Sequence, residues 1–404
     1  MDLEEPWCGA CEWNLDHFPL DQRSSWFWGR MRRSDQVAGF RSDLRLAQST
    51  TASPIDPTPR RVLVSVSALI LLGVAAAILG GLYLIVGTPS LSHVPIGLVL
   101  LVVGAMLLPR VTRLKPMLAD AWVVKPDKAP ALHRLIDRVA AELAGPKPDV
   151  VIVNVDWNAA VTHVGLRGRK VLVLGVPLLL ALQPRHLVAL LAHELGHLRH
   201  DDYRRNQLIH PARTTFGRVS RMIKFPIRII ENAGPATGFL LAWQIVAGLV
   251  SWVLWVIHLA VNALASGDRR RVELRADAAA IQVAGTTATL ETIDLTAMLP
   301  ELQKYVQRYV PKGQAAAKWR TFLRDVRERE LESAPAWRQL SVRTEASLFA
   351  SHPAPGRRYQ WLAGQPASPA IVVLDETEAE RIEKEIAPYA EAIHRTMLDA
   401  VVYE

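Results

Sequence analysis

The sequence predicts an α+β fold that is mostly α-helical and follows an N-terminal transmembrane helical hairpin. Two apolar runs, residues 62–86 and 95–108, lie on either side of a short loop without Lys, Arg, Asp or Glu. The first run is long enough to cross a bilayer, and residues of the loop can extend the second. Valine-rich runs at 148–156 and 169–175 predict two strands, whereas the segments after them show mostly helical periodicity.

The charges around the two apolar runs predict the orientation of the hairpin, residues 61–110. Arg60 and Arg61 precede the first run, and Arg110 and Arg113 follow the second. The positive-inside rule therefore puts both ends of the hairpin in the cytoplasm. Because the first run begins only after residue 60, we do not expect it to be a signal peptide. Length and composition leave a soluble helical hairpin as the alternative.

Residues 1–60 are expected to form a cytosolic N-terminal segment that ends in a flexible linker at 48–60. The chain has two cysteines, Cys8 and Cys11, and both lie here. We therefore expect no disulfide framework, which agrees with a reducing compartment. Their C-x-x-C spacing is that of half a zinc ribbon, and a complete site would need further ligands from this segment or from a second subunit. Cys8 and Cys11 are thus a candidate site for a second Zn²⁺ ion.

The motif HELGH at residues 193–197 is the most informative feature of the chain. Positions i and i+4 of a helix share one face, so His193 and His197 can present their imidazoles to one metal ion. Glu194 adjoins the first ligand, where its carboxylate can act as general base on a zinc-bound water. A buried helix with two satisfied histidines is the alternative, but it would bury three polar groups without evident partners. The motif therefore predicts a catalytic zinc site.

The residues that follow the motif distinguish two known types of zinc peptidase. The metzincin pattern requires a glycine and a histidine where this chain has His200 and Tyr203, so that type is excluded. The gluzincin pattern takes a glutamate from a later helix, and Glu273 and Asp277 stand at a spacing of i, i+4 within 266–280. Glu273 can ligate the metal while Asp277 orients a ligand histidine through its other ring nitrogen.

Four motifs in the chain carry a family resemblance. They are Asn-Ala-Ala at 158–160, HELGH at 193–197, RRVELRAD at 270–277 and SHPAPGRR at 351–358. In this order they resemble the membrane-associated gluzincin endopeptidases of the HtpX and CAAX prenyl protease type. The resemblance covers about residues 148–365 and implies a zincin-like metallopeptidase domain over residues 111–404, with one catalytic Zn²⁺ ion.

The resemblance implies a role for the residues around the metal. His193, His197 and Glu273 would be the protein ligands of the zinc, with a water in the fourth position. Glu194 would deprotonate that water and later protonate the leaving amine, and Asp277 would hold a ligand histidine. The zinc-activated water would then hydrolyse peptide bonds.

His352 and Arg358 belong to the last motif, and their role is less defined. By resemblance, one of the two would donate a hydrogen bond to the tetrahedral oxyanion, as a catalytic residue. His352 could instead ligate the zinc in a closed resting form. As a third alternative, His352 is a loop histidine before a turn-forming proline.

The resemblance also implies a strand that binds substrate. Asn158, Ala159 and Ala160 would line an edge strand to which an extended polypeptide adds by main-chain pairing. This mode requires an unfolded or strand-like substrate and reads few side chains. It suits broad cleavage of damaged proteins better than cleavage of one defined peptide.

The apolar run 239–265 limits the topology, because it lies between His197 and Glu273. A single crossing would put these two ligands on opposite sides of the membrane. The long apolar helix expected over 236–265 must therefore pair with another crossing segment, enter and leave the membrane, or pack on the domain. We favour a basic amphipathic segment, 206–232, on the inner leaflet, followed by a long helix that is membrane-embedded or shields the active site. A soluble helical hairpin or a surface for self-association, hence a homo-oligomer, is the alternative.

These features together predict a multi-pass zinc endopeptidase of the inner (plasma) membrane with a cytosolic catalytic domain. Its expected partners are the lipid bilayer and unfolded or membrane polypeptides, with a role in membrane-protein quality control and stress response and without nucleic acid. A CAAX-type prenyl-protein endopeptidase is a narrower alternative. A catalytically silent membrane scaffold that binds a partner through the zincin fold is the rival, but a site used only for binding has no need of Glu194.

Overall fold

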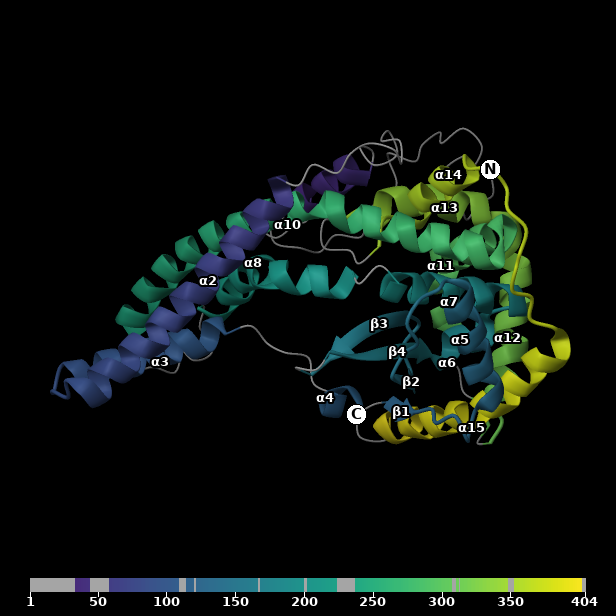
Figure 1. The fold of residues 1–404 in the computed structure, drawn as a ribbon, viewed down its shortest axis with the longest axis horizontal. Helices are drawn as coiled ribbons and strands as arrows, with labels where there is room; N and C mark the ends of the chain where they lie inside the picture. The colour runs from purple at the N-terminus through teal and green to yellow at the C-terminus, as the bar shows by residue number, and fades with distance from the viewer. Residues whose placement is uncertain are drawn as a thin grey trace. The chain divides into compact units, whose positions relative to one another are not determined.

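The computed structural model describes most of the chain (Figure 1). The described residues are 33–43, 58–108, 114–119, 121–165, 168–199, 202–223, 237–306, 310–311, 313–347 and 352–401. They are mostly α-helical with one small sheet, which confirms the predicted α+β class. Cys8 and Cys11 lie outside the described residues, so a second metal site stays a prediction.

The chain divides into two units. The first consists of Met1–Ser49, Val111–Tyr203 and Arg270–Glu404, and the second of Thr50–Arg110 and Arg204–Arg269. These units cut across the predicted division into segment, hairpin and domain. The apolar run 239–265 lies wholly in the second unit, and the chain returns to the first unit at Arg270.

The first unit contains a four-stranded sheet of order β1-β2-β4-β3. Its strands are β1 (Ala121–Val123), β2 (Val150–Asn154), β3 (Ala159–Val164) and β4 (Arg169–Gly175). β2 and β4 run parallel, whereas β1 and β3 are antiparallel to their neighbours. β2 and β4 lie in the two runs for which the sequence predicts strands. Among the described residues, β3 pairs with a strand on one side only, so it is an edge strand.

Helices make up the rest of the first unit. They are α4 (Leu114–Met117), α5 (Pro130–Glu142), α6 (Val176–Ala181), α7 (Pro184–Arg199), α11 (Thr286–Val306), α12 (Ala315–Glu330), a 3₁₀ turn (Leu331–Ser333), α13 (Ala334–Thr344), α14 (Pro355–Ala363), α15 (Glu376–Val401) and the helical residues 33–43. The last part of the 48-residue helix α10 (Thr237–Ala284) also belongs here. Leu135 of α5, Leu172 of β4 and Leu191 of α7 are fully buried in one shared core.

α7 lies in this core, which explains why its polar residues are buried. The helix begins at Pro184, a residue suited to a first helical turn because it needs no intrahelical partner for its nitrogen. Leu187, Leu191 and Leu195 recur every four residues and are at most 7% exposed. Burial extends around the whole helix and includes His193. A buried histidine requires a partner, which directs attention to the residues that surround it.

The second unit is built from long helices. They are α2 (Thr58–Leu82), a π-helical turn (Tyr83–Gly87), α3 (His93–Leu107), most of α8 (Asp202–Met222) and the first part of α10. α2 and α3 approach closely where Gly81 and Gly97 meet. A side-chain carbon on either would lie 2.8 or 2.7 Å from the carbonyl oxygen of the other.

α8 packs along α10 through polar contacts between the two helices. The Ser251 hydroxyl donates to the carbonyl of Ser220 at 2.8 Å, and the Asn262 amide donates to the carbonyl of Arg213 at 3.3 Å. As the residue numbers rise along α8, those of their partners fall along α10, so the helices are antiparallel. The apolar run 239–265 thus has a helical partner in the same unit.

Many large apolar side chains of the second unit are exposed. Leu69, Leu72 and Leu79 of α2 are about two-thirds exposed (67%, 65% and 66%), and Ile245 of α10 is 76% exposed. Exposed apolar side chains in this number are unusual on a protein surrounded by water. Two described helices, Thr58–Gly87 and Ala242–Ala284, are long and apolar enough to cross a membrane, and α3 is apolar but shorter.

Candidate metal centre

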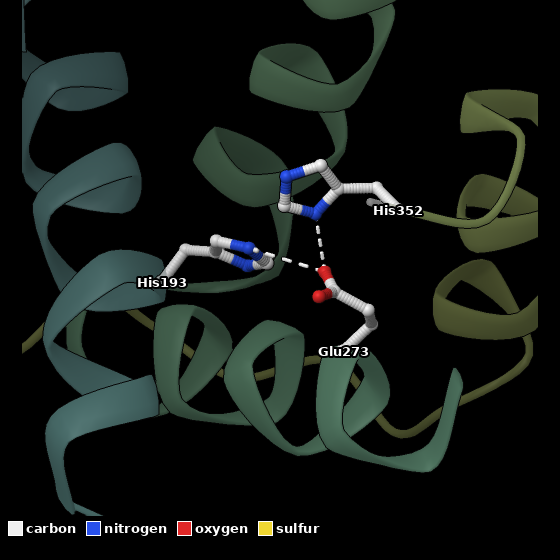
Figure 2. Close-up of side chains that lie close together, drawn as sticks. All are labelled: His193, Glu273 and His352. Atoms are coloured by element: carbon white, nitrogen blue, oxygen red, sulfur yellow. Dashed lines mark hydrogen bonds and ion pairs between the residues drawn. The ribbon is translucent and has the colours of Figure 1, made fainter. Parts of the chain in front are cut away.

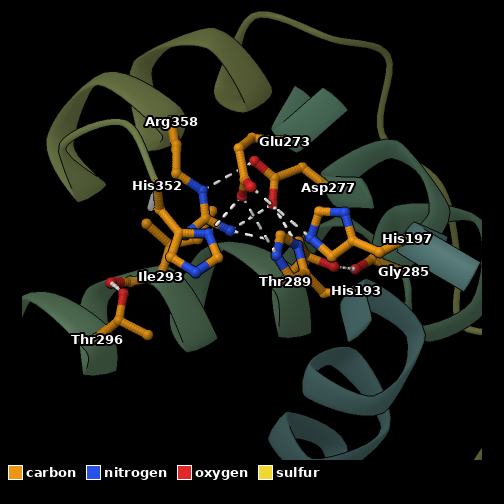
Figure 3. Close-up of polar contacts among 10 residues, drawn as sticks. All are labelled: His193, His197, Glu273, Asp277, Gly285, Thr289, Ile293, Thr296, His352 and Arg358. Carbon is orange, nitrogen blue, oxygen red and sulfur yellow. Dashed lines mark hydrogen bonds and ion pairs between the residues drawn. The ribbon is translucent and has the colours of Figure 1, made fainter. Parts of the chain in front are cut away.

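The carboxylate of Glu273 on α10 faces His193 and His352 (Figure 2), and His197 lies beside them (Figure 3). Its Oε2 atom lies 3.6 Å from Nε2 of His193, and its Oε1 atom lies 3.8 Å from Nε2 of His197. Oε2 also contacts Nδ1 of His352, which belongs to the short segment before α14. The ligating atoms of His193, Glu273 and His352 all lie within 4.8 Å of one another. The fold thus brings together residues from three distant parts of the sequence.

The donor set fits a zinc ion. Ligand atoms at tetrahedral angles and bond lengths of about 2.0–2.1 Å lie about 3.3 Å apart, close to the distances from Glu273 to His193 and His197. Nε2 of His193 is buried yet has no hydrogen-bond partner among the described residues. A buried nitrogen lone pair without a partner is costly unless it binds something. Imidazole and carboxylate ligands of this number suit zinc.

Asp277 fixes the other side of the His193 ring (Figure 3). Nδ1 of His193 lies 2.9 Å from Oδ1 of Asp277 and 3.4 Å from Nη2 of Arg358. Both cannot be hydrogen bonds at once, and the shorter contact to a carboxylate assigns the proton to Nδ1. The lone pair of Nε2 is then directed at Glu273. This is how a carboxylate sets the tautomer of a metal-binding histidine.

Arg358 holds Asp277 in turn. Its Nε donates to Oδ2 of Asp277 at 2.9 Å, and its Nη2 donates to Oδ1. Such a two-point contact between a guanidinium and a carboxylate restricts both position and orientation. Asp277 is fully buried and Arg358 is 8% exposed. The pair is therefore an internal support for His193 rather than a surface ion pair.

The charges of the cluster favour the protonation states that metal binding requires. Burial opposes ionisation of Glu273, but the nearby histidines, His352 above all, lower its pKa to about 2. Burial also opposes ionisation of Asp277, yet Arg358 and His193 bring its pKa below the ordinary value. Burial lowers the pKa of His193. Near neutral pH the carboxylates are therefore charged and His193 is neutral.

A cavity of about 420 Å³ opens beside this cluster. Glu194, which is 3% exposed, lies in its wall together with His193. Asn158 and Ala159, at the start of β3, line the cavity as well, while Ala160 lies in β3 without being part of the wall. His352 and Arg358 complete the wall on the side of α14. Most of the predicted site residues among the described ones therefore line this cavity, whereas Ala160, His197 and Glu273 do not.

α11 forms a wall of the cavity that no motif in the sequence predicts. Thr289, Thr292 and Thr296 line the cavity together with Ile293. Their hydroxyls donate to backbone carbonyls of their own helix segment at 2.9, 2.7 and 2.6 Å. Because these hydroxyls are already bonded, this wall offers few free donors to a substrate. The only signal in the sequence is the helical spacing of the threonines, which is too common to indicate a site.

Gly196, within the HELGH motif, allows α7 to approach α10 closely. A side-chain carbon at this position would lie 2.9 Å from Cβ of Ala279 and 3.2 Å from Cα of Ala276. Neither neighbour is a flexible side chain that could move aside. The close approach brings His193 and His197 within reach of Glu273, so glycine is required here for the site as well as for packing.

We expect Gly196→Ala to lower the free energy of unfolding and the zinc content together. Alanine usually stabilises a helix by about 1 kcal/mol relative to glycine, but overpacking a close helix contact costs about 1–3 kcal/mol. Thermal unfolding in detergent and metal analysis of the purified protein would measure both quantities. Gly267→Ala in α10 is the matched control, because its side chain would enter open space and should not destabilise. Equal behaviour of the two variants would contradict this account of Gly196.

Comparison with known proteins now identifies the family. Residues 126–365, more than half of the chain, match peptidase family M48. The chain belongs to peptidase family M48. The matched segment contains every residue of the metal centre and of the cavity wall. This confirms the resemblance to HtpX-type metallopeptidases that the four motifs indicate.

Two relatives are similar over part of their length. The chain is 30% identical to Protease HtpX homolog 2 of Methanosarcina mazei over 175 residues, which cover 42% of this chain and 55% of the relative. It is 35% identical to Protease HtpX homolog 1 of Streptomyces coelicolor over 80 residues, 20% of this chain and 26% of the relative. The chain thus spans about half and about a quarter of these relatives. No solved structure gives a significant match.

Proposed function

We propose that the protein is a zinc-dependent, membrane-bound endopeptidase that cleaves unfolded or membrane polypeptides. The largely buried cluster of His193, His197 and Glu273 next to Glu194 is the observation that carries this proposal. Zinc bound here would act as a Lewis acid and would lower the pKa of a water in its open position to about 7. Family membership supports a peptidase reaction, and the donor set supports zinc.

Glu194 is the general base in this proposal. It adjoins His193 in α7 and faces the cavity, so it can accept a proton from the attacking water and pass it to the leaving amine. Arg358 is engaged by Asp277, so we assign it first to holding the Asp277–His193 contact. His352 can donate to the oxyanion or serve as a further ligand in a resting state, since its Nδ1 contacts Glu273.

β3 is suited to hold an extended substrate. It is an edge strand whose first residue, Ala159, lines the cavity that contains Glu194, as does Asn158 directly before it. A polypeptide can pair with the open edge of such a strand only where its own main chain is extended and unpaired. This requirement favours unfolded substrates, as expected of an enzyme in membrane-protein quality control and stress response. A prenylated C-terminal peptide is the narrower alternative.

Two helical hairpins are the membrane topology that we propose. His197 and Glu273 must meet at one metal, so the chain between them crosses the bilayer an even number of times. The hairpin α2–α3 supplies two crossings, and the antiparallel contact of α8 with α10 favours a second pair of crossings over the inner-leaflet position expected for residues 206–232. Basic residues beside the hairpin ends put the catalytic unit in the cytosol, on the inner face of the plasma membrane. The loss of a helical hairpin from the membrane would expose its apolar surface to water, which is unfavourable.

Zinc removal is the experiment that tests the proposed function. Dialysis of the detergent-solubilised protein against a strong zinc chelator is expected to abolish cleavage of an unfolded protein such as casein. The reason is that the chelator removes the zinc that would activate the attacking water. One equivalent of Zn²⁺ should restore the activity, and Mg²⁺ should not, since the ligands suit zinc. Cleavage by protein that metal analysis shows to be free of zinc would refute the proposal. Cleavage of a prenylated peptide alone would favour the CAAX alternative.

A further inference from the structure

Helix 33–43 lies outside the segment that matches the family, yet it packs within the catalytic unit (dark purple in Figure 1). Gly39 of this helix is buried against the backbone of Ser347. A side-chain carbon on Gly39 would lie 2.6 Å from the backbone nitrogen of Ser347. Only a glycine lets two backbones approach this closely. The N-terminal helix is therefore seated on the segment that leads to His352.

Arg270 of α10 binds to both partners of this contact, helix 33–43 and Ser347. Its Nε pairs with the carboxylate of Asp43 at the end of the N-terminal helix, and these residues are only 4% and 2% exposed. Its Nη2 donates to the carbonyls of Gly39 at 3.4 Å and Ser347 at 3.3 Å. Loss of one partner from a buried ion pair leaves an uncompensated charge. One guanidinium thus joins three segments that are far apart in the sequence.

Two further contacts hold the same junction. The Ser347 hydroxyl donates to Oδ2 of Asp35 at 2.6 Å. The guanidinium carbons of Arg343 and Arg357 lie 5.8 and 5.2 Å from the centre of the Phe40 ring, within the range of cation–π attraction. The helix is thus held by an ion pair, by hydrogen bonds and by its aromatic side chain, along most of its length.

The two segments that helix 33–43 joins are those that carry Glu273 and His352. Arg270 lies three residues, about one helical turn, before Glu273, and Ser347 lies five residues before His352. Glu273 and His352 are also the pair in direct contact within the metal cluster.

We propose that helix 33–43 positions the metal centre. Asp43 and Arg270 are positioning residues that maintain the position of Glu273 relative to His352. This proposal rests on the proposed zinc-peptidase function. The position of helix 33–43 also puts residues 33–43 on the same side of the bilayer as the metal centre. The chain therefore crosses the membrane an even number of times between Asp43 and Arg270, which agrees with two hairpins.

The test compares three variants of the full-length protein in detergent. Asp43→Asn removes the charge that Arg270 pairs with, and Ser347→Ala removes only the hydroxyl bonded to Asp35. Val37→Ala is the control, because Val37 lies on the same helix and is 44% exposed. The zinc dissociation constant is measured by competition with a chromophoric chelator, and the melting temperature is measured on the zinc-free protein.

Asp43→Asn is expected to raise the zinc dissociation constant about 10-fold or more, as removal of a residue that supports a metal ligand does. Ser347→Ala should raise it about five-fold, the value of one ordinary hydrogen bond, and it keeps the test decisive if Asp43→Asn does not fold. Val37→Ala should change nothing. A lower melting temperature with an unchanged dissociation constant in Ser347→Ala and Asp43→Asn would show a purely structural role and overturn the proposal. If the wild-type protein binds no zinc, the proposed function itself fails, which is a separate result.

Discussion

Replacement of Glu194 by glutamine is expected to lower kcat by about 10³-fold or more, while the protein keeps its fold and its zinc. General base catalysis typically contributes about 10²–10⁴-fold, and Glu194 would serve both as acceptor and as later donor of the proton. Glutamine has nearly the same shape but cannot accept that proton. Cleavage of an unfolded protein and of a membrane protein, with zinc content measured in parallel, would show the effect.

The same variant separates the enzyme from a membrane scaffold. A scaffold that only binds a partner would function equally well with glutamine at position 194. Glu291→Gln is the matched control, since Glu291 also contacts α7, through Arg185 at 2.8 Å and His186 at 3.1 Å, but lies outside the cavity. We expect its kcat to be that of the wild type. Equal cleavage by Glu194→Gln and wild type would defeat the peptidase proposal.

The metal centre could be predicted largely from the sequence, because its geometry is mostly local. The spacing of His193 and His197, and that of Glu273 and Asp277, places each pair on one face of a helix without any knowledge of the fold. What joins the two pairs is tertiary. The close contact of Gly196 with Ala279 brings the helices together, and no periodicity in either helix specifies that contact.

Other features could not be predicted because they depend on pairing between distant segments. The α11 wall of the cavity contains threonines whose hydroxyls are bonded within the helix, so their composition suggests polarity that this wall does not offer to a substrate. The seating of Gly39 on Ser347 joins residues more than 300 positions apart. Residues 48–60 have the composition of a tether, but no pattern in the sequence indicates a docked helix before them. The antiparallel packing of α8 on α10 was one of three alternatives that the ligand spacing left open.

Arg358→Met is expected to lower the free energy of unfolding by about 3–5 kcal/mol, the cost of removing one partner from a buried ion pair. Asp277 is fully buried, and Arg358 is the cation that contacts both of its oxygens. Methionine fills similar space but leaves that carboxylate uncompensated. Urea unfolding of the full-length protein in detergent would measure the loss. A change below about 1 kcal/mol, the range of exposed ion pairs, would contradict this account of the pair.

The double variant Asp277→Asn/Arg358→Met then separates stability from metal binding. With both charges gone, no buried charge is left unpaired, so much of the stability lost in Arg358→Met should return. Zinc affinity should not return, because the neutral amide oxygen of asparagine is a weaker acceptor for the Nδ1 proton of His193 than the carboxylate, and loss of such a charged partner weakens metal binding about 10–100-fold. Stability that recovers together with zinc affinity would mean that Asp277 serves only to neutralise Arg358. Stability that recovers while affinity stays low would show that this buried pair orients His193.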